Sequence, residues 1–142
     1  MEKIWKKEFD LKVLNDHAKN SMVEHVGIEF VEVGDNYLKA IMPVDHRTKQ
    51  PMGLLHGGAS VTLAETMGST ASFLVLEDGF YSVGLEIKAN HIKSATQGVV
   101  TGVVVPLHMG KTTQIWDISI TNEDGELTCA SRITMAVLKM KS

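Results

Sequence analysis

The segment from Gly57 to Leu76 is the least polar long stretch of the chain, and its pattern predicts a buried helix. It consists mostly of apolar and small residues, and its one charged side chain is Glu65. Such a helix has no face of mixed charges to turn toward water. An interior glycine such as Gly68 costs about 1 kcal/mol relative to alanine. We therefore expect another backbone or a ligand to approach this helix closely.

After the helix the apolar positions recur every second residue, which is typical of a β-strand. In the range Tyr81–Ala95, four apolar residues alternate with polar or small ones and are expected to share one face: Val83, Leu85, Ile87 and Ala89. This pattern predicts one long strand directly downstream of the helix.

Three further strands are predicted in the ranges 98–107, 112–121 and 127–139. Turn residues separate them at 109–110 and 122–125, and in the second of them Trp116, Ile118 and Ile120 fall on one face. Four strands joined by tight turns predict an antiparallel sheet.

The first part of the chain predicts two short helices and two strands. Asp10 can cap a helix over Leu11–Lys19, and the range 21–27 suits one or two more helical turns. Two strands around a turn at 34–36 follow, and then a polar loop over Asp45–Gly53. With only one long helix, the economical arrangement is an α+β fold in which a curved antiparallel sheet wraps around it.

Composition narrows the class of protein. A length of 142 residues fits a single domain over 1–142, and a net charge of -3 argues against nucleic acid as a partner. The only cysteine is Cys129, so no disulfide forms within the chain, which fits a cytoplasmic location. Neither a signal segment nor a membrane span is apparent. The six histidines show no metal-ligand spacing, so we expect no metal and no redox cofactor.

Glu65 is the first candidate for chemistry. A helix glutamate is most simply solvated, but this one has no Lys or Arg three or four residues away to pair with. Helical spacing puts it on one face with Val61, Gly68, Ser69 and Ser72. Small neighbours leave room for a ligand beside the carboxylate, so the pattern favours a functional role.

The start of the helix is the second candidate. His56 precedes Gly57 and Gly58, whose amides carry the positive end of the helix dipole and have no acceptor within the helix. They form a plausible oxyanion site for acyl transfer. Alternatively, the glycines only permit a tight helix entry and His56 is a core histidine. "GGASVT" nearly matches G-x-S-x-G, but its place inside a helix makes Ser60 a poor nucleophile.

Helix geometry sets a condition on any site that uses both features. Gly57 and Glu65 are eight residues apart, which is about 12 Å along one helix. Both must approach the same acyl carbon within roughly 3 Å. They must then come from two different helices, and so from two subunits. This predicts at least a homodimer with active sites between subunits.

Several segments carry a family resemblance that extends over nearly the whole chain: "MVEHVGIEF", "QPMGLLHGGASVTLAETMGS", "VGLEIKANHIKSA" and "PLHMGKTTQIWDI". The sequence resembles the hot-dog-fold acyl-CoA thioesterases of the phenylacetate-pathway type. Within that group it is most similar to 1,4-dihydroxy-2-naphthoyl-CoA thioesterases and to enterobactin proofreading thioesterases. The resemblance implies the hot-dog fold and hydrolysis of an aromatic or medium-sized acyl-CoA, without a cofactor.

The same resemblance implies a role for each matching residue. Glu65 would be the nucleophile or the general base for water, and the Gly57 amide would polarise the thioester carbonyl. Gln50 would hold the carbonyl or the water, and His56 would orient the thioester or assist the leaving thiolate. Ser69 would hydrogen-bond the carboxylate or the lytic water.

For the CoA phosphates, the resemblance points to His91, Lys93 and Ser94. Close relatives carry Arg then Pro where this chain has Lys93 then Ser94, and Lys93 also fits an ordinary strand-end lysine. Homodimers that pair into a homotetramer are implied as well. Two alternative functions are a non-catalytic acyl-CoA-binding hot-dog protein and a hot-dog 3-hydroxyacyl dehydratase using His56 and Glu65. Gln50 and Ser69 fit hydrolysis better than dehydration.

Overall fold

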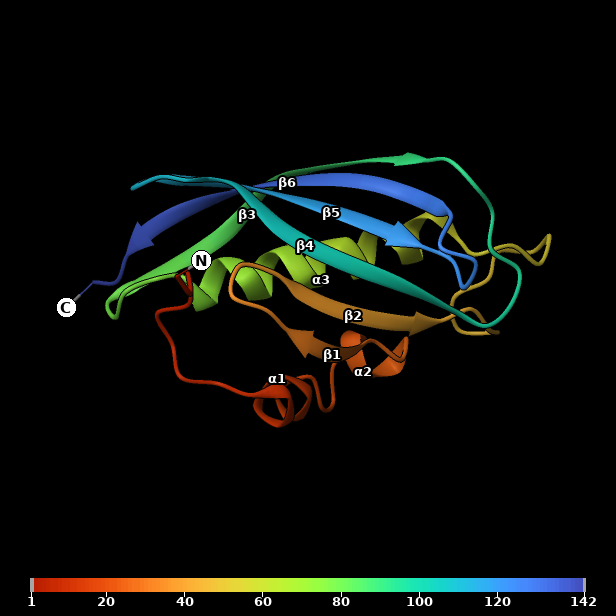
Figure 1. Ribbon diagram of the computed structural model, residues 1–142, viewed down its shortest axis with the longest axis horizontal. Coiled ribbons are helices and arrows are strands. Elements are labelled where there is room, and N and C mark those ends of the chain that lie inside the picture. Colours follow the sequence, from red (N-terminus) through yellow and green to blue (C-terminus); the bar gives the residue numbers. More distant parts are fainter. Residues whose placement is uncertain (1, 142) are drawn as a thin grey trace.

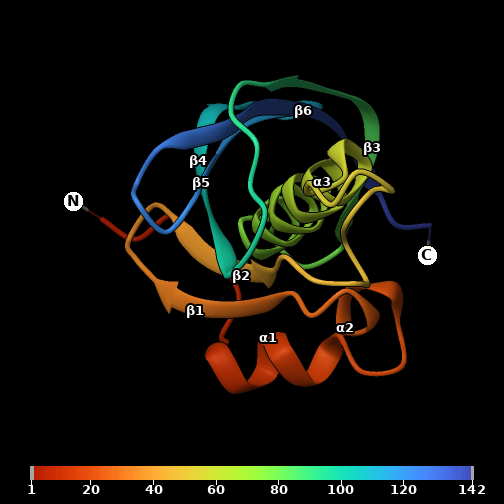
Figure 2. The same ribbon diagram turned by 90° about the vertical axis from the view of Figure 1, so that its right-hand side faces the viewer.

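One six-stranded sheet curves around one long helix in the computed structural model, which describes residues 2–141 (Figure 1). The elements in chain order are α1 (Leu11–His17), α2 (Met22–His25), β1 (Glu29–Val33), β2 (Leu38–Pro43), α3 (Gly57–Leu74), β3 (Phe80–His91), β4 (Val99–Met109), β5 (Thr113–Thr121) and β6 (Leu127–Lys139). All paired strands are antiparallel. Figure 2 looks along the curve and shows α3 inside it, with α1 and α2 beside β1. The predicted α+β arrangement is confirmed.

The place of β3 corrects one prediction. The strand order is β1-β2-β4-β5-β6-β3, so β3 pairs with β6 and forms one edge of the sheet. The connection over residues 92–98 therefore crosses from that edge to the interior strand β4. Tight turns join β4 to β5 and β5 to β6 as predicted, but no such turn joins β3 to β4. As an edge strand, β3 leaves one row of backbone groups without a neighbouring strand in the protomer.

The face predicted for β3 is also wrong in part. Ile87 and Ala89 pack against the core, whereas Val83 and Leu85 are 41% and 62% exposed. The register with β6 shifts between Gly84 and Glu86. A bulge of this kind adds one residue to a strand and reverses the alternation of side chains beyond it. Strict alternation along the sequence could not reveal the reversal.

The core lies between α3 and the concave face of the sheet. From β5, the side chains of Trp116, Ile118 and Ile120 are all buried, so their predicted shared face is confirmed. The helix ends at Leu74 rather than Leu76. Its buried positions are Ser60, Leu63, Ala64, Met67, Gly68, Ala71, Ser72 and Leu74.

Close approach to the helix, expected from its small residues, occurs at Gly68. A Cβ atom there would lie 2.5 Å from Cγ2 of Ile133 on β6. One turn later, the Ser72 hydroxyl hydrogen-bonds the hydroxyl of Ser82 on β3 at 2.8 Å. Both residues thus face the sheet, and the prediction that they share the open face of Glu65 is wrong.

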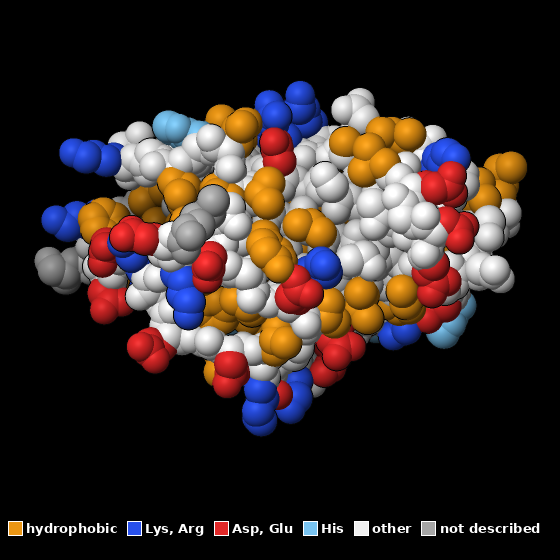
Figure 3. All heavy atoms as spheres, in the orientation of Figure 1, with side chains coloured by type: hydrophobic (Ala, Val, Ile, Leu, Met, Phe, Trp, Pro, Cys, Tyr) orange, Lys and Arg blue, Asp and Glu red, His pale blue; other side chains and the backbone are white. Residues whose placement is uncertain are grey.

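The outer surface carries both signs of charge. Figure 3 shows basic and acidic side chains interspersed over one face, with apolar side chains between them. Ion pairs such as Arg132 with Asp117 and Lys7 with Asp78 join charges across this surface. None of the helices in residues 2–141 has the length and hydropathy needed to cross a membrane.

The contact at Gly68 generates a stability prediction. Gly68→Ala raises helix propensity, but the new methyl group would lie 2.5 Å from a side-chain carbon of Ile133, a core residue that is 1% exposed. We expect a net loss of about 1 kcal/mol or more in the free energy of unfolding. Thr66→Ala, on the half-buried side of the same helix, is the control and should be nearly neutral. Urea unfolding measures both, and a stabilised Gly68→Ala variant contradicts the packing argument.

Candidate active site

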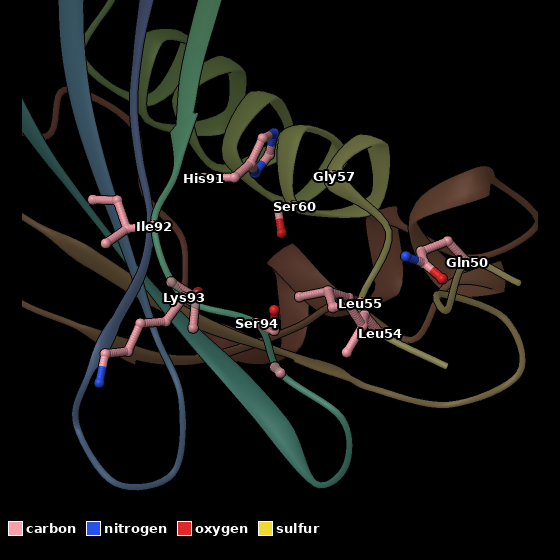
Figure 4. Close-up of a pocket in the computed structure, with 11 residues that line it drawn as sticks. Gln50, Leu54, Leu55, Gly57, Ser60, His91, Ile92, Lys93 and Ser94 are labelled. Carbon is pink, nitrogen blue, oxygen red and sulfur yellow. The ribbon is translucent and has the colours of Figure 1, made fainter. Parts of the chain in front are cut away.

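Five of the predicted site residues meet in one cavity of about 270 Å³ at the start of α3 (Figure 4). These are Gln50, Gly57, His91, Lys93 and Ser94. They come from three segments far apart in the sequence: the loop before α3, the first turn of α3, and the end of β3 with the residues after it. The cavity is completed by Leu54, Leu55, Ser60, Ile92, Ala95 and Thr128.

The loop before α3 is held in shape by its own hydrogen bonds. Arg47 forms a bidentate pair with Asp45, and its guanidinium lowers the pKa of that carboxyl to about 2. Thr48 is 2% exposed, and its hydroxyl donates to the carbonyl of Pro43 at 2.7 Å. The Thr48 carbonyl in turn accepts from the His56 amide at 2.8 Å. A fixed loop therefore delivers both Gln50 and the helix start to the cavity.

The two glycine amides at the start of α3 have different partners. The Gly58 N–H donates to Nδ1 of His56 at 2.8 Å, so the imidazole caps the helix. The Gly57 N–H has no acceptor among residues 2–141 and remains available for a substrate oxygen. Because Nδ1 accepts, a neutral His56 ring carries its proton on Nε2 and can donate from there.

Gly57 also leaves space that another residue would fill. A Cβ atom at this position would lie 2.9 Å from Nε2 of His91. The imidazole of His91 thus lies beside the backbone of Gly57 at the start of α3. The predicted role of His91 in binding CoA stays a prediction, and the structure brings this ring next to Gly57.

Gln50 presents a hydrogen-bond donor to the cavity. Its Oε1 atom accepts from the Met52 amide, which leaves Nε2 without a protein partner among the described residues. Figure 4 shows this nitrogen directed toward the cavity. A donor suits a carbonyl oxygen, so of the two roles that the resemblance implies, holding the carbonyl fits the geometry better.

Lys93 contributes its backbone to the cavity, but its ammonium lies elsewhere. In Figure 4 the side chain leads away from the other residues, and its Nζ atom pairs with Glu126. The hydrogen bond from Lys93 lowers the pKa of the Glu126 carboxyl, and a second one from Asn122 at 3.1 Å lowers it further. A phosphate group at Lys93 must therefore compete with a carboxylate.

Glu65 and Ser69 are not brought to this cavity. Both lie farther along the unbroken helix α3, so Gly57 and Glu65 of one protomer are about 12 Å apart along its axis. Glu65 is exposed in the single chain, with neither an ion-pair nor a hydrogen-bond partner in residues 2–141. Its Oε2 atom lies beside the bulge of β3, where a Cβ on Gly84 would be 3.5 Å away. Within one protomer, the Glu65 carboxylate is therefore open to water.

Sequence reasoning missed Ser60 and Thr128 as cavity residues. Ser60 is 3% exposed, and Figure 4 shows its hydroxyl pointing into the cavity. The sequence could have indicated this position, because Ser60 follows Gly57 by three residues and residues three apart share a helix face. Thr128 reaches the cavity because β6 pairs with β3, with His91 opposite Cys129. No local pattern reveals that pairing.

The cavity is thus lined by hydrogen-bond donors at the N-terminus of α3. The Gly57 amide and Gln50 Nε2 can hold an oxygen that gains negative charge during a reaction. The positive end of the α3 dipole adds to this stabilisation. No group of three His, Cys, Asp or Glu side chains in the described part of the chain could hold a metal ion.

Comparison with known proteins places this chain among thioesterases. A family model described as the thioesterase superfamily matches residues 52–129. The chain is 53% identical over 135 residues to a 1,4-dihydroxy-2-naphthoyl-CoA hydrolase of Escherichia coli, covering 95% of this chain and 99% of that protein. It is 50% identical over 135 residues to the proofreading thioesterase EntH of Cronobacter turicensis, covering 95% and 98%.

Solved structures agree with these relatives. A thioesterase from Haemophilus influenzae superposes with a TM-score of 0.95 at 47% identity, covering 98% of this chain and 97% of that one. A mutant thioesterase from Pseudomonas aeruginosa, with a glutamine changed to alanine, gives a TM-score of 0.94 at 47% identity, covering 96% and 99%.

The helix cap generates a second prediction. His56→Ala leaves the Gly58 amide without its side-chain acceptor and should lower the free energy of unfolding by about 1 kcal/mol. His56→Asn restores a good capping residue, so its stability should stay close to that of the wild type. Urea unfolding of the two variants checks this. Equal stability of His56→Ala and wild type shows that the cap contributes nothing.

Proposed function

Because this chain belongs to the thioesterase superfamily and is a thioester hydrolase of the hot-dog fold, we propose that it cleaves an aromatic or medium-sized acyl-CoA to the free acid and CoA. The observation that carries the proposal is the presence on one helix of a Gly57 amide without an acceptor and a Glu65 carboxylate without a partner among the described residues. A thioester is already activated, so an oxyanion site and a positioned carboxylate are sufficient for hydrolysis.

The site is completed by a second protomer. The open face of α3 carries Glu65, Ser69 and Phe73, and next to it runs the free edge of β3 with Val83 and Leu85 exposed. A second copy related by a two-fold axis covers both features at once and brings its own Gly57 to Glu65. It also removes water from around the carboxylate, which strengthens it as a nucleophile or base. Each homodimer then has two equivalent sites.

Hydrolysis in this site follows from the donors and the carboxylate. The Gly57 amide and Gln50 of one subunit hold the thioester oxygen while Glu65 of the other either attacks the carbonyl carbon or removes a proton from an attacking water. The carbon–sulfur bond breaks, the acyl group leaves as the acid after water has added, and the thiolate takes up a proton. His56 Nε2–H can hydrogen-bond the sulfur as its charge develops. Ser69, one turn beyond Glu65, can hydrogen-bond the carboxylate or the water.

Recognition of CoA rests on the end of β3. His91 and Ser94 line the cavity, and Lys93 can supply a cation once a phosphate displaces Glu126. The Escherichia coli relative is named for a CoA thioester, which supports CoA as the carrier here. Exposed apolar residues on β4 and β6, Val105, Leu107 and Leu138, support the pairing of dimers into a homotetramer. A cytoplasmic location stays a prediction.

Mixing two inactive variants tests the shared site. Glu65→Ala and Gln50→Ala should each lower kcat/KM for benzoyl-CoA by about a hundredfold or more, measured as thiol release. Refolded together at equal amounts, half of the dimers are mixed, and each mixed dimer has one intact site. About a quarter of wild-type activity should return.

Two controls accompany the mixing experiment. Each variant refolded alone should stay inactive, and Glu77→Ala, an exposed carboxylate beyond the end of α3, should behave as wild type. If the mixture shows no more activity than the separate variants, the whole site lies within one protomer. Full activity of Glu65→Ala alone shows that Glu65 is not needed for hydrolysis, whereas a wild type that releases no thiol favours the non-catalytic acyl-CoA-binding protein.

The ion pair at Lys93 generates a further prediction. Glu126→Gln removes the competing carboxylate, so KM for acyl-CoA should fall about threefold at low salt, the scale of an exposed ion pair. KM for the matching acyl-pantetheine, which lacks the CoA nucleotide phosphates, should not change. Asp124→Asn removes a charge from the same turn and is the control. An equal change with both substrates shows that Lys93 does not contact the nucleotide.

A further inference from the structure

A second cavity, of about 640 Å³, lies at the end of the molecule where α3 finishes. Its walls come from the chain before α1, the residues after α3, the turn between β4 and β5, and the end of β6. In Figure 1 these segments gather at the left, whereas α3 starts at the right. We call it the β4–β5 cavity, and the lining residues that matter most below are Lys6, Leu76, Phe80, Lys111, Gln114 and Val137.

The β4–β5 cavity is separate from the candidate active site. The two cavities share no lining residue within 2–141. Roughly 25 Å of helix separates Gly57, at the first cavity, from Leu74, where α3 ends next to the second. The volume of the β4–β5 cavity falls in the range of small-ligand sites, roughly 300–1,000 Å³. It can therefore hold a molecule that takes no part in the thioester chemistry.

Most of the wall of the β4–β5 cavity is apolar. Leu76 is 6% exposed, and the side chains of Phe80 and Val137 are only partly covered. Ile4 and Met109 add further apolar surface. A ligand with a hydrocarbon body would remove this surface from water, which is favourable at roughly 25 cal/mol per Å².

Gln114 places one hydrogen-bond donor in this apolar wall. The residue is 2% exposed, and its Oε1 atom accepts from the indole N–H of Trp116 at 2.9 Å. Because an indole N–H can only donate, this bond fixes which end of the Gln114 amide is the nitrogen. That Nε2 atom has no acceptor within residues 2–141, and every fully enclosed side-chain nitrogen or oxygen there has a partner. The Nε2 atom must therefore reach the surface of the cavity, where a ligand oxygen can accept from it.

The charged side chains around the cavity favour an anion. Lys6 and Lys111 contribute two ammonium groups and Glu77 one carboxylate, which leaves a single surplus positive charge. The Lys6–Glu77 pair is long, at 3.8 Å, and both of its side chains are more than half exposed, so it is weak. Lys111 has no ion-pair partner in the described part of the chain.

Backbone hydrogen bonds hold the two sides of the cavity in place. The Lys6 N–H donates to the Leu74 carbonyl at 2.8 Å, so the chain before α1 is attached to the end of α3. The Gly110 N–H donates to the Thr113 carbonyl at 2.8 Å and closes the turn between β4 and β5. This turn carries Lys111, so the cation and the Gln114 donor, three residues apart, come from one fixed segment. A preformed site loses less free energy to ordering when a ligand binds.

We propose that the β4–β5 cavity binds an apolar monocarboxylate, such as a medium-chain fatty acid. The carboxylate accepts from Gln114 Nε2 and pairs with the Lys111 ammonium. The hydrocarbon part packs against Leu76, Phe80 and Val137. This inference goes beyond the proposed function, because none of these residues takes part in hydrolysis and binding needs no thioester.

The test measures dissociation constants of three ten-carbon probes by isothermal titration calorimetry at low salt. The probes are decanoate, decan-1-ol and decyltrimethylammonium, which differ in the charge of the head group. Wild type should bind decanoate about tenfold more tightly than decan-1-ol, the scale of a hydrogen bond to a charged group, and should not bind the cation. Absence of decanoate binding, or equal binding of decanoate and decan-1-ol, overturns the inference.

Two variants locate the binding. Lys111→Gln should weaken decanoate binding about threefold to fivefold, the scale of an exposed ion pair, and leave decan-1-ol unchanged. Val137→Trp fills the apolar part of the cavity and should weaken both ligands by about tenfold or more. Both variants should keep the wild-type kcat/KM for benzoyl-CoA, because the β4–β5 cavity lies outside the candidate active site.

Each variant has a matched control. Lys88→Gln removes the same charge from an exposed position on β3, and Leu138→Trp adds the same ring on the opposite face of β6. Neither should change the affinity for decanoate. Circular dichroism verifies folding, and Lys111→Gln decides alone if Val137→Trp does not fold. Wild-type affinity in the folded variants shows that decanoate binds elsewhere and overturns the inference, while the thioesterase proposal stands.

Discussion

The separation of Gly57 from Glu65 along one straight helix is the constraint on which the rest of the structure depends. About 12 Å of helix lies between the amide and the carboxylate. The helix cannot bend to close this gap, because the sheet encloses it and β6 approaches within contact distance of the backbone at Gly68. In the proposed homodimer, one protomer therefore supplies the Gly57 amide of one site and the Glu65 carboxylate of the other.

The same packing explains why the functional groups share one side of α3. The curved sheet covers the rest of the helix, and its edge strand β3 stops short of enclosing the last face. Glu65, Ser69 and Phe73 occupy that opening, between β3 on one side and α1 on the other. In the proposed homodimer, this opening is the surface that the second copy covers.

Much of this could be predicted from the sequence, because the signals are local. The long helix and its approximate bounds follow from a run of apolar and small residues, and the cap at Asp10 follows from residue type. The buried face of β5, which includes Trp116, follows from the two-residue period of a strand. Gln50 and Gly57 were found from a motif, and they do meet in one cavity. What escaped prediction depends on pairing across the chain. The bulge in β3, the partnership of β3 with β6, and the ion pair between Lys93 and Glu126 join residues more than 30 positions apart.

The tight enclosure of α3 also fixes the angular register of its residues. Each residue turns the helix by about 100°, so a single insertion between Gly57 and Glu65 would swing the carboxylate from the open face toward the interior strands. Everything after the insertion, including Gly68, would turn with it and meet the sheet with the wrong surface. We therefore expect related proteins to differ in the lengths of the loops around this helix, but not in the number of residues within the helix.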